Sequence, residues 1–279
     1  RYDMAGRIAK DYRGKGLPGV TAAWELSSEP FFHVGGVGLI KFRASWGRIG
    51  NMASIEDLGY GYPRLSANYT NQVGDGAPRS NSLSLGSLFN PQLTWETSEQ
   101  KDIGFDFSFL NQRLSITGDY FNKLTYDLIK EKDTEWTNTF GLGAPLINQG
   151  KIRNTGYELA ATWKDNAGAL SYDFGANIAT LKNRVEYIDE NPQSFWLHTD
   201  NWRTVLRPFR SIVGQPYYSY WLIKNEGIFQ SDAEANAYVK DGKKIQPDAK
   251  AGDFKFKDLN NDGKIDDADR SYMGSAAPK

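Results

Sequence analysis

The chain has 0 cysteines among its 279 residues, which excludes disulfide bonds and metal sites built from thiolates. It has no long apolar run, and its mean hydropathy of -0.58 excludes a membrane-spanning helix, although a β-barrel with a polar lumen stays open. Its 33 Lys and Arg residues nearly equal its 34 Asp and Glu residues, and this balance argues against a nucleic-acid partner.

Signals for catalysis are also scarce. The chain has 2 histidines, His33 and His198, and neither lies in a metal-binding or nucleophile motif. No serine-hydrolase elbow is present. The sequence also reveals no pair of carboxylates with a known separation, so a glycosidase has no geometric support. We therefore expect that the protein is not an enzyme.

Aromatic residues, in contrast, are abundant, at 14% of the chain. Outer-membrane barrels carry girdles of aromatic side chains at both membrane interfaces. A β-sandwich packs aromatic side chains into its core instead. Composition alone leaves both architectures open.

The most informative pattern is an amphipathic hairpin at residues 101–122. Apolar and polar residues alternate over 103–109 and again over 114–120, with a polar turn at 111–113 between them. Successive side chains of a strand point to opposite faces, so each arm has one apolar and one polar face. Each arm is about nine residues long, which is enough for a tilted strand to cross a bilayer.

The same alternation recurs elsewhere in the chain and predicts further half-buried strands. These strands are expected at residues 20–26, 39–47, 156–163 and 170–178. Helical periodicity is confined to one short segment, residues 232–240, for which Ser231 is the candidate N-cap.

The connections between these strands alternate in length. Residues 27–38, 110–113 and 164–169 form short connections, whereas residues 48–99 and 123–153 and those from 182 onward form long ones. Compact soluble domains seldom contain long loops without structure. Outer-membrane barrels have short periplasmic turns and long extracellular loops. The rhythm therefore favours a barrel, with Ile103, Phe105 and Phe107 facing lipid.

Several blocks in a consistent order resemble the SusC/RagA family of TonB-dependent outer-membrane transporters of Bacteroidetes. The matching blocks are Asn90-Pro91-Gln92-Leu93-Thr94-Trp95-Glu96, residues 100–107, residues 110–114, residues 120–129, residues 148–159 and residues 252–279, with Arg43-Ala44-Ser45-Trp46-Gly47 upstream. They span nearly the whole chain. Residues 52–88 and 183–213 match poorly, which is typical of variable outward loops.

The resemblance implies an all-β fold, a partial transmembrane antiparallel β-barrel taken from a 22-stranded barrel, with long extracellular loops. Residues 1–279 would belong to the barrel domain of a longer protein, and residues 183–279 would be mainly extracellular loop. The plug domain and the TonB-contacting segment of the family would lie outside this chain. The polar positions Asp106, Ser108, Thr117 and Asp119 would line the lumen.

By the same resemblance, the protein would actively import oligosaccharides, or else peptides, across the outer membrane. Its partners would be a SusD-like surface lipoprotein, TonB and outer-membrane lipid, and a homodimer of transporter–lipoprotein pairs is an implied assembly. The alternative from another class is a secreted, calcium-stabilised β-sandwich, acting as a carbohydrate-binding module or glycoside hydrolase.

Residues 258–269 form the sharpest local motif. Oxygen-bearing side chains recur at the spacing of an EF-hand loop, with Gly263 at the sharp turn. The predicted Ca²⁺ ligands are Asp258, Asn260, Asp262, Lys264 through its backbone carbonyl, Asp266 and Asp269. Asp269 departs from the usual glutamate and is shorter. An Asx-rich turn that needs no ion is the alternative.

Aromatic residues in the expected outward loops also allow two interpretations: they bind a ligand or partner, or they pack among themselves. Packing is favoured for any single residue. The residues are Trp136, Tyr187, Phe195, Trp196, Trp202, Tyr217, Tyr218, Tyr220 and Trp221.

Overall fold

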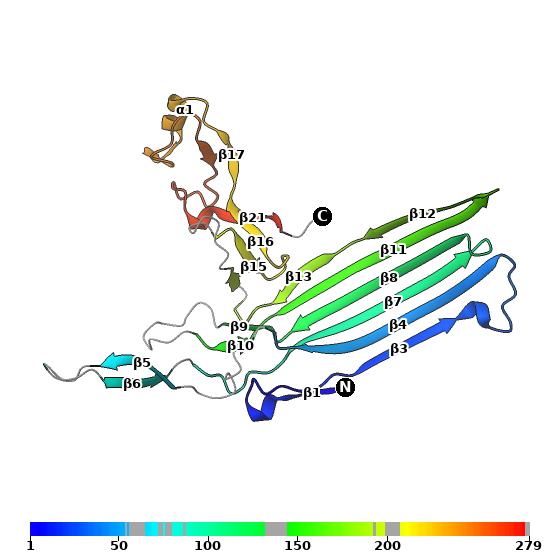
Figure 1. The fold of residues 1–279 in the computed structure, drawn as a ribbon. Coiled ribbons are helices and arrows are strands. Elements are labelled where there is room, and N and C mark those ends of the chain that lie inside the picture. Colours follow the sequence, from blue (N-terminus) through cyan, green and yellow to red (C-terminus); the bar gives the residue numbers. More distant parts are fainter. Residues whose placement is uncertain are drawn as a thin grey trace. The chain divides into compact units, whose positions relative to one another are not determined.

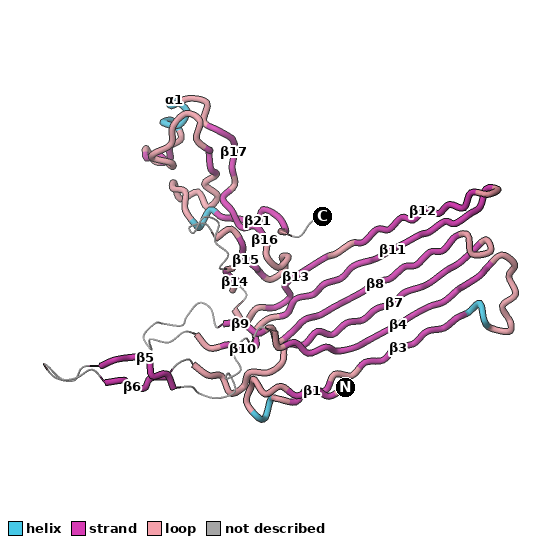
Figure 2. The backbone as a smooth tube through the Cα atoms, viewed as in Figure 1, coloured by secondary structure: helices cyan, strands magenta, loops and turns pink. Residues whose placement is uncertain are grey.

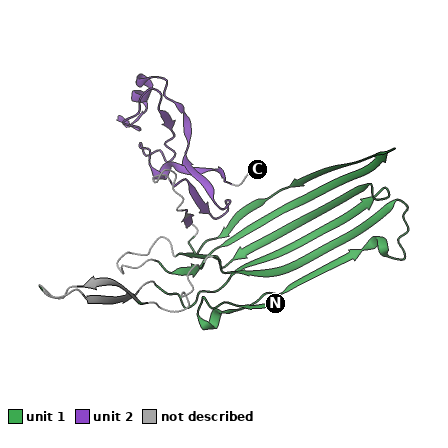
Figure 3. Cartoon of the chain, viewed as in Figure 1, with its two compact units in different colours: residues 1–192 green, residues 193–279 purple. Residues whose placement is uncertain are grey.

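The computed structural model describes residues 1–53, 55, 65–71, 75, 80–85, 88–131, 144–191, 194–198 and 207–276. The chain divides into two compact units, residues 1–192 and residues 193–279 (Figure 3). Within the described ranges, no helix is both long enough and apolar enough to cross a membrane.

The first unit is built on one antiparallel sheet whose long strands lie side by side in the order β12-β11-β8-β7-β4-β3 (Figure 1). The strands are β3 (Gly19–Glu25), β4 (Val37–Asn51), β7 (Glu96–Phe109), β8 (Leu114–Tyr126), β11 (Lys151–Ala167) and β12 (Leu170–Ala179), and β13 (Lys182–Tyr187) also pairs with β11. All the strands predicted from alternation are confirmed. Most of them are longer than predicted, because pairing continues into residues that do not alternate.

The hairpin of β7 and β8 has the register that its alternation requires, with Phe105 opposite Gly118 and Asp106 opposite Thr117. Its turn uses three consecutive residues with positive φ, namely Leu110, Asn111 and Gln112, at 55°, 56° and 66°. Asparagine tolerates this conformation, whereas leucine seldom adopts it. The turn is therefore held by the pairing of the two arms rather than by its own sequence.

β12 and β13 continue one another along the same edge of β11. Glu158 pairs with Ala179 and Thr155 pairs with Lys182, so the register is unbroken between them. At the junction, the backbone N–H of Thr180 donates to the carbonyl of Tyr157 at 2.8 Å. The N–H of Tyr157 in turn donates to Oγ1 of Thr180 at 3.0 Å.

The three short connections, β3–β4, β7–β8 and β11–β12, all lie at one end of the sheet, as predicted (Figure 2). The other end carries small paired strands, which are β1 (Tyr2–Met4), β2 (Gly14–Gly16), β5 (Leu65–Asn71), β6 (Ser80–Leu85), β9 (Ile129–Glu131) and β10 (Leu146–Asn148). An apolar core at this end is formed by Ile8, Ile55, Leu93, Trp95 and Ile129, and Leu146 of β10 packs against it.

The second unit has its own secondary structure in a region that the sequence assigns mainly to loop. Its sheet has the order β14 (Phe195–Leu197), β15 (Phe209–Ile212), β16 (Ser219–Ile223) and β21 (Arg270–Ser275). Two smaller pairs join β17 (Asn225–Ile228) to β20 (Phe254–Phe256) and β18 (Val239–Lys240) to β19 (Lys243–Lys244). The predicted helix is confirmed as α1 (Asp232–Ala237), with the Ser231 hydroxyl accepting the N–H of Glu234 at 3.1 Å.

Candidate functional site

The polar face of the main sheet carries an ion cluster that joins three strands. Arg43 of β4 donates through Nε to Oδ2 of Asp106 on β7 at 2.8 Å. It also donates through Nη2 to Oδ2 of Asp119 on β8 at 3.1 Å. One guanidinium therefore binds two carboxylates from neighbouring strands, and its planar fork of donors suits this arrangement.

Gly104 makes this bridge sterically feasible. It lies directly between Arg43 and Asp119 in the register of the three strands. A Cβ at position 104 would lie 2.1 Å from Oδ1 of Asp119 and 3.0 Å from the carbonyl of Gly118. The missing side chain lets the carboxylate of Asp119 lie over β7 and reach Arg43.

A hollow of about 240 Å³ lies beside this cluster on the same face. Its lining includes Thr21, Arg43, Ser45, Asp102 and Asp119. The Ser45 hydroxyl donates to Asp102 at 2.9 Å, and the Gln100 amide also donates to Asp102 at 2.9 Å. The polar face of the sheet therefore presents charged and hydroxyl groups that can hydrogen-bond a molecule in this hollow.

The four residues predicted to line the lumen do share this face. Asp106 and Asp119 meet at Arg43, and Thr117 lies opposite Asp106 in the register. Ser108 is buried, and its hydroxyl has no hydrogen-bond partner among the described residues. Sequence reasoning missed the central role of Arg43, because the pairing register that brings it to both carboxylates is not visible in the chain.

The opposite face of the sheet is apolar and open. Ring contacts run along it, with Phe105 and Phe107 stacked at 4.5 Å and Phe107 edge-on to Phe42 at 5.7 Å between ring centroids. Ile103 on β7 and Tyr157 on β11 lie on inner strands of the sheet, on either side of β8, and are still 66% and 64% exposed. Contiguous exposed apolar surface of this kind is typical of contact with lipid or a partner.

The outward-loop aromatics of the second unit pack against one another. Ring centroids of Trp196 and Tyr217 are 6.0 Å apart, those of His198 and Tyr218 are 3.9 Å apart, and Trp196 is 1% exposed. His198 is buried and pairs with the Ser211 hydroxyl at 2.7 Å. Packing therefore accounts for Trp196, Tyr217 and Tyr218, while Trp136 and Trp202 lie outside the described residues.

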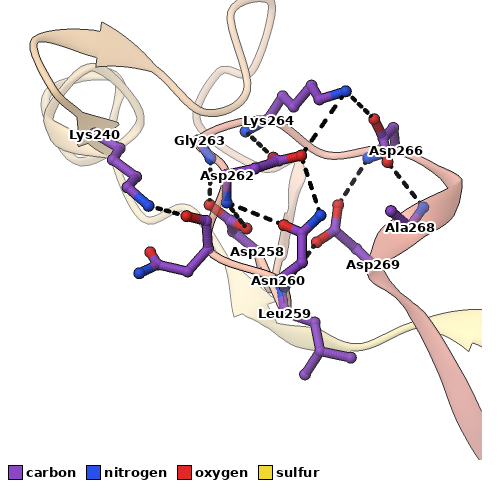
Figure 4. Close-up of polar contacts among 11 residues, drawn as sticks. Lys240, Asp258, Leu259, Asn260, Asp262, Gly263, Lys264, Asp266, Ala268 and Asp269 are labelled. Carbon is purple, nitrogen blue, oxygen red and sulfur yellow. Dashed lines mark hydrogen bonds and ion pairs between the residues drawn. The ribbon is translucent and has the colours of Figure 1, made fainter.

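The predicted calcium loop is closed by its own hydrogen bonds (Figure 4). Asp258 accepts the backbone N–H groups of Asp262 and Gly263, at 3.1 and 2.8 Å. Asp269 is fully buried, and it accepts the N–H groups of Leu259 and Asp266, each at 2.8 Å.

The ammonium of Lys264 lies where a cation would compete for the same oxygens. It is 2.5 Å from Asp266 and 3.8 Å from Asp262, and Asn260 donates to Asp262 at 3.0 Å. Lys264 and the N–H of Ala268 lower the pKa of Asp266. No three acidic, histidine or cysteine side chains in the described parts of the chain come close enough to hold a metal ion. Both the calcium site and the ion-free turn stay predictions.

Known proteins resemble this chain over most or all of its length. Residues 1–264 match the family model described as TonB dependent receptor-like, beta-barrel. TonB-dependent receptor P26 of Formosa agariphila is 27% identical over 281 residues, covering 100% of this chain and 27% of the relative. TonB-dependent receptor SusC of Bacteroides thetaiotaomicron is 26% identical, over 66% of this chain and 18% of the relative.

Solved structures show the same fold. The RagAB peptide importer in the open-open state matches 98% of this chain and 27% of its own, with a TM-score of 0.74 and 15% identity. The closed-closed state matches 99% of this chain with a TM-score of 0.73. The chain spans about a quarter of the length of these relatives, 27% in the first of them.

The comparisons decide between the two architectures that composition left open. A family model that covers 264 residues describes a barrel and not a sandwich, so the β-sandwich alternative is wrong. The two faces of the sheet agree, since a barrel wall in a membrane needs an apolar outside and a polar inside. The family is one of transporters and is not enzymatic. The chain belongs to the β-barrel region of the TonB-dependent receptors, proteins of the outer membrane that include SusC.

Proposed function

We propose that the receptor containing this chain imports a nutrient across the outer membrane by TonB-dependent active transport. The observation that carries the proposal is the two-faced sheet, with the Arg43–Asp106–Asp119 cluster on its polar face and open apolar surface on the other. Energy would come from the inner membrane through TonB, and no covalent step is needed.

The substrate class is an oligosaccharide or a peptide. The polar wall offers carboxylates, a guanidinium and hydroxyls, which bind either class through hydrogen bonds. The RagAB importer, whose fold this chain shares, takes up peptides, which supports the peptide. The oligosaccharide follows from the resemblance to SusC and stays a prediction.

A growth experiment tests import. The receptor gene is deleted and the strain is grown on a panel of single glycans and peptides, with a strain lacking TonB in parallel. We expect both strains to lose growth on the same class of substrate, and the intact gene to restore it. Unchanged growth on the whole panel, or rescue by a receptor unable to contact TonB, contradicts the proposal.

We also propose a SusD-like surface lipoprotein as the partner. The resemblance to the SusC/RagA family, in which such a lipoprotein is paired with the barrel, supports this partner, and the chain shares the fold of the RagAB peptide transporter. Affinity purification of the tagged full-length receptor from its own membrane should retain one lipoprotein at equal amount. Its absence under mild detergent, with the receptor still folded, contradicts the pairing.

For the loop at residues 258–269 we propose a structural Ca²⁺ ion, supported by the ligand spacing. Lys264 competes for the same carboxylates, so Lys264→Ala should increase Ca²⁺ affinity, whereas Asp262→Asn should reduce it. Calcium titration of the full-length receptor measures both, with Lys243→Ala as the exposed control. No bound Ca²⁺ in the wild type and in Lys264→Ala would establish the ion-free turn.

A further inference from the structure

The side chains on the lipid-facing side of the sheet change from apolar to charged toward the end that carries the long connections. On β7 its apolar positions run from Phe109 to Ile103, and the next two outward positions are Lys101 and Glu99. On β11 the same face changes from Tyr157 to Arg153. The apolar stretch of β7 covers six intervals of about 3.4 Å, roughly 20 Å along the strand. At a strand tilt of about 40° this is roughly 15 Å along the membrane normal, the greater part of an outer-membrane apolar band about 25 Å tall.

Charged residues beyond this band lie in two connected groups. In one, Arg48 binds Glu99 at 2.9 Å and Lys101 lies 3.7 Å from the same carboxylate. In the other, Arg153 donates to Glu186 at 3.0 Å and to Asn122 at 2.7 Å. These contacts place the side chains on the face that also carries the apolar band.

Cations outnumber anions in this row. Arg184 lies directly opposite Arg153, and Lys182 lies opposite Thr155, both on the same face and both exposed. With two carboxylates, Glu99 and Glu186, the row keeps a net positive charge. We name it the cationic belt, and its cations are Arg48, Lys101, Lys151, Arg153, Lys182 and Arg184.

Aromatic side chains mark the boundary between the band and the belt. Tyr120 and Tyr157 lie with ring centroids 5.0 Å apart, and the guanidinium of Arg48 lies 5.4 Å from the ring centre of Trp46. Trp and Tyr concentrate at the level of lipid headgroups. The cationic belt therefore lies at or just beyond that level, on the side with the long connections.

We propose that the cationic belt binds the phosphate groups of lipid headgroups in the outer leaflet. Arginine and lysine pair with phosphate oxygens through charge-assisted hydrogen bonds, and arginine can do so with two donors. Positive side chains beside a membrane attract anionic headgroups strongly enough to affect lipid choice. The inference rests on the membrane position of the sheet and is independent of the substrate that the receptor imports.

A lipid fits this surface better than a soluble anion. The belt is continuous with the apolar band through Ile103 and Tyr157, which are 66% and 64% exposed. A lipid satisfies both surfaces at once, with its acyl chains on the band and its phosphate on the belt. A free phosphate ion would use only the belt.

The experiment titrates the full-length receptor, purified in detergent, with diphosphorylated lipid A and with the same lipid A lacking its phosphates. Native mass spectrometry counts the bound lipids. We expect the wild type to prefer the phosphorylated form by at least about tenfold. The variant K101Q/K182Q/R184Q should lose this preference, and the charge-conserving variant K101R/K182R/R184K should keep it.

The matched control K10Q/K243Q/K250Q removes three exposed cations elsewhere and should bind phosphorylated lipid A as the wild type does. Equal affinity of the wild type for both lipid forms overturns the proposal. This comparison needs only the wild type, so it tests the proposal even if K101Q/K182Q/R184Q fails to fold. An equal loss in the control also overturns it. Displacement of the lipid by inorganic phosphate at the same concentration would assign the belt to a soluble anion instead.

Discussion

At the scale of single residues, the polar wall depends on a position without a side chain. Arg43 reaches Asp119 only because Gly104 leaves the space between them open. Alternation in the sequence identifies Asp106 and Asp119 as polar positions of neighbouring strands. It does not show that one arginine binds both, because that depends on register across β4, β7 and β8.

We expect Gly104→Ala to destabilise the receptor by about 1–3 kcal/mol, because the new methyl group overlaps the Asp119 carboxylate and approaches the Gly118 carbonyl. Thermal unfolding of the full-length receptor in detergent measures this. Gly175→Ala is the control, since its nearest neighbour would be 3.9 Å away. If Asp119→Ala leaves the cost of Gly104→Ala unchanged, the clash lies elsewhere than the Asp119 carboxylate.

The closed loop should respond to acid through Asp266. Lys264 and the N–H of Ala268 lower the pKa of Asp266 below its ordinary 3.8, so its stabilising contact is complete above that value and is lost as the pH falls through the lowered one. Lys264→Met should raise the pH at which hydrogen-exchange protection of residues 258–269 is half lost. Lys243→Met removes another exposed lysine and should leave this pH unchanged. If Lys243→Met shifts it equally, the Lys264–Asp266 contact is not the cause.

At the scale of elements, alternation located the strands and the capping serine located α1. Both are local signals, carried by residues within one turn or one pleat. The end of the helix was not predictable: Val239 and Lys240 fit helical spacing but pair with β19 instead. The same limit applies to residues 193–276, where short strands such as β16 are formed by non-local pairing that the sequence does not show.

The N-cap gives a direct test of the helix. Ser231→Ala removes the acceptor for the N–H of Glu234, and we expect a loss of about 1 kcal/mol in local stability. Faster amide exchange over residues 232–237 in the full-length receptor would report it. Ser271→Ala is the control, because within the described residues that hydroxyl makes only a 3.8 Å contact with the Met273 sulfur. Equal changes in both variants would rule out capping as the explanation.

At the scale of the whole molecule, the sheet separates two environments. Two neighbouring alanines of β11 lie one in each environment. Ala160 pairs with Thr117 on the polar face, and Ala161 pairs with Ile116 on the apolar face. Alternation predicted an apolar and a polar face, the loop lengths favoured a barrel, and the family resemblance made the barrel specific, whereas composition alone left two architectures open. The substrate is not predictable from the wall, because hydroxyls and carboxylates suit more than one class.

The two alanines therefore form a matched pair. Ala161→Arg places a charge in the middle of the apolar band and should cost about 2–4 kcal/mol in a bilayer. Ala160→Arg adds the same side chain to the polar face and should cost much less. Unfolding of the full-length receptor in lipid vesicles by guanidinium chloride compares them. A larger cost for Ala160→Arg would reverse the assignment of the two faces.

The Arg43 cluster has a mechanical consequence. Sliding β4 against β7 by one pleat repeat of two residues would move the guanidinium by roughly 7 Å along the strand and break its contacts with Asp106. The second contact, with Asp119, extends this resistance to β8. The Arg43 side chain thus links β4, β7 and β8 and resists their sliding past one another. A force applied along the barrel axis is therefore shared among the three strands.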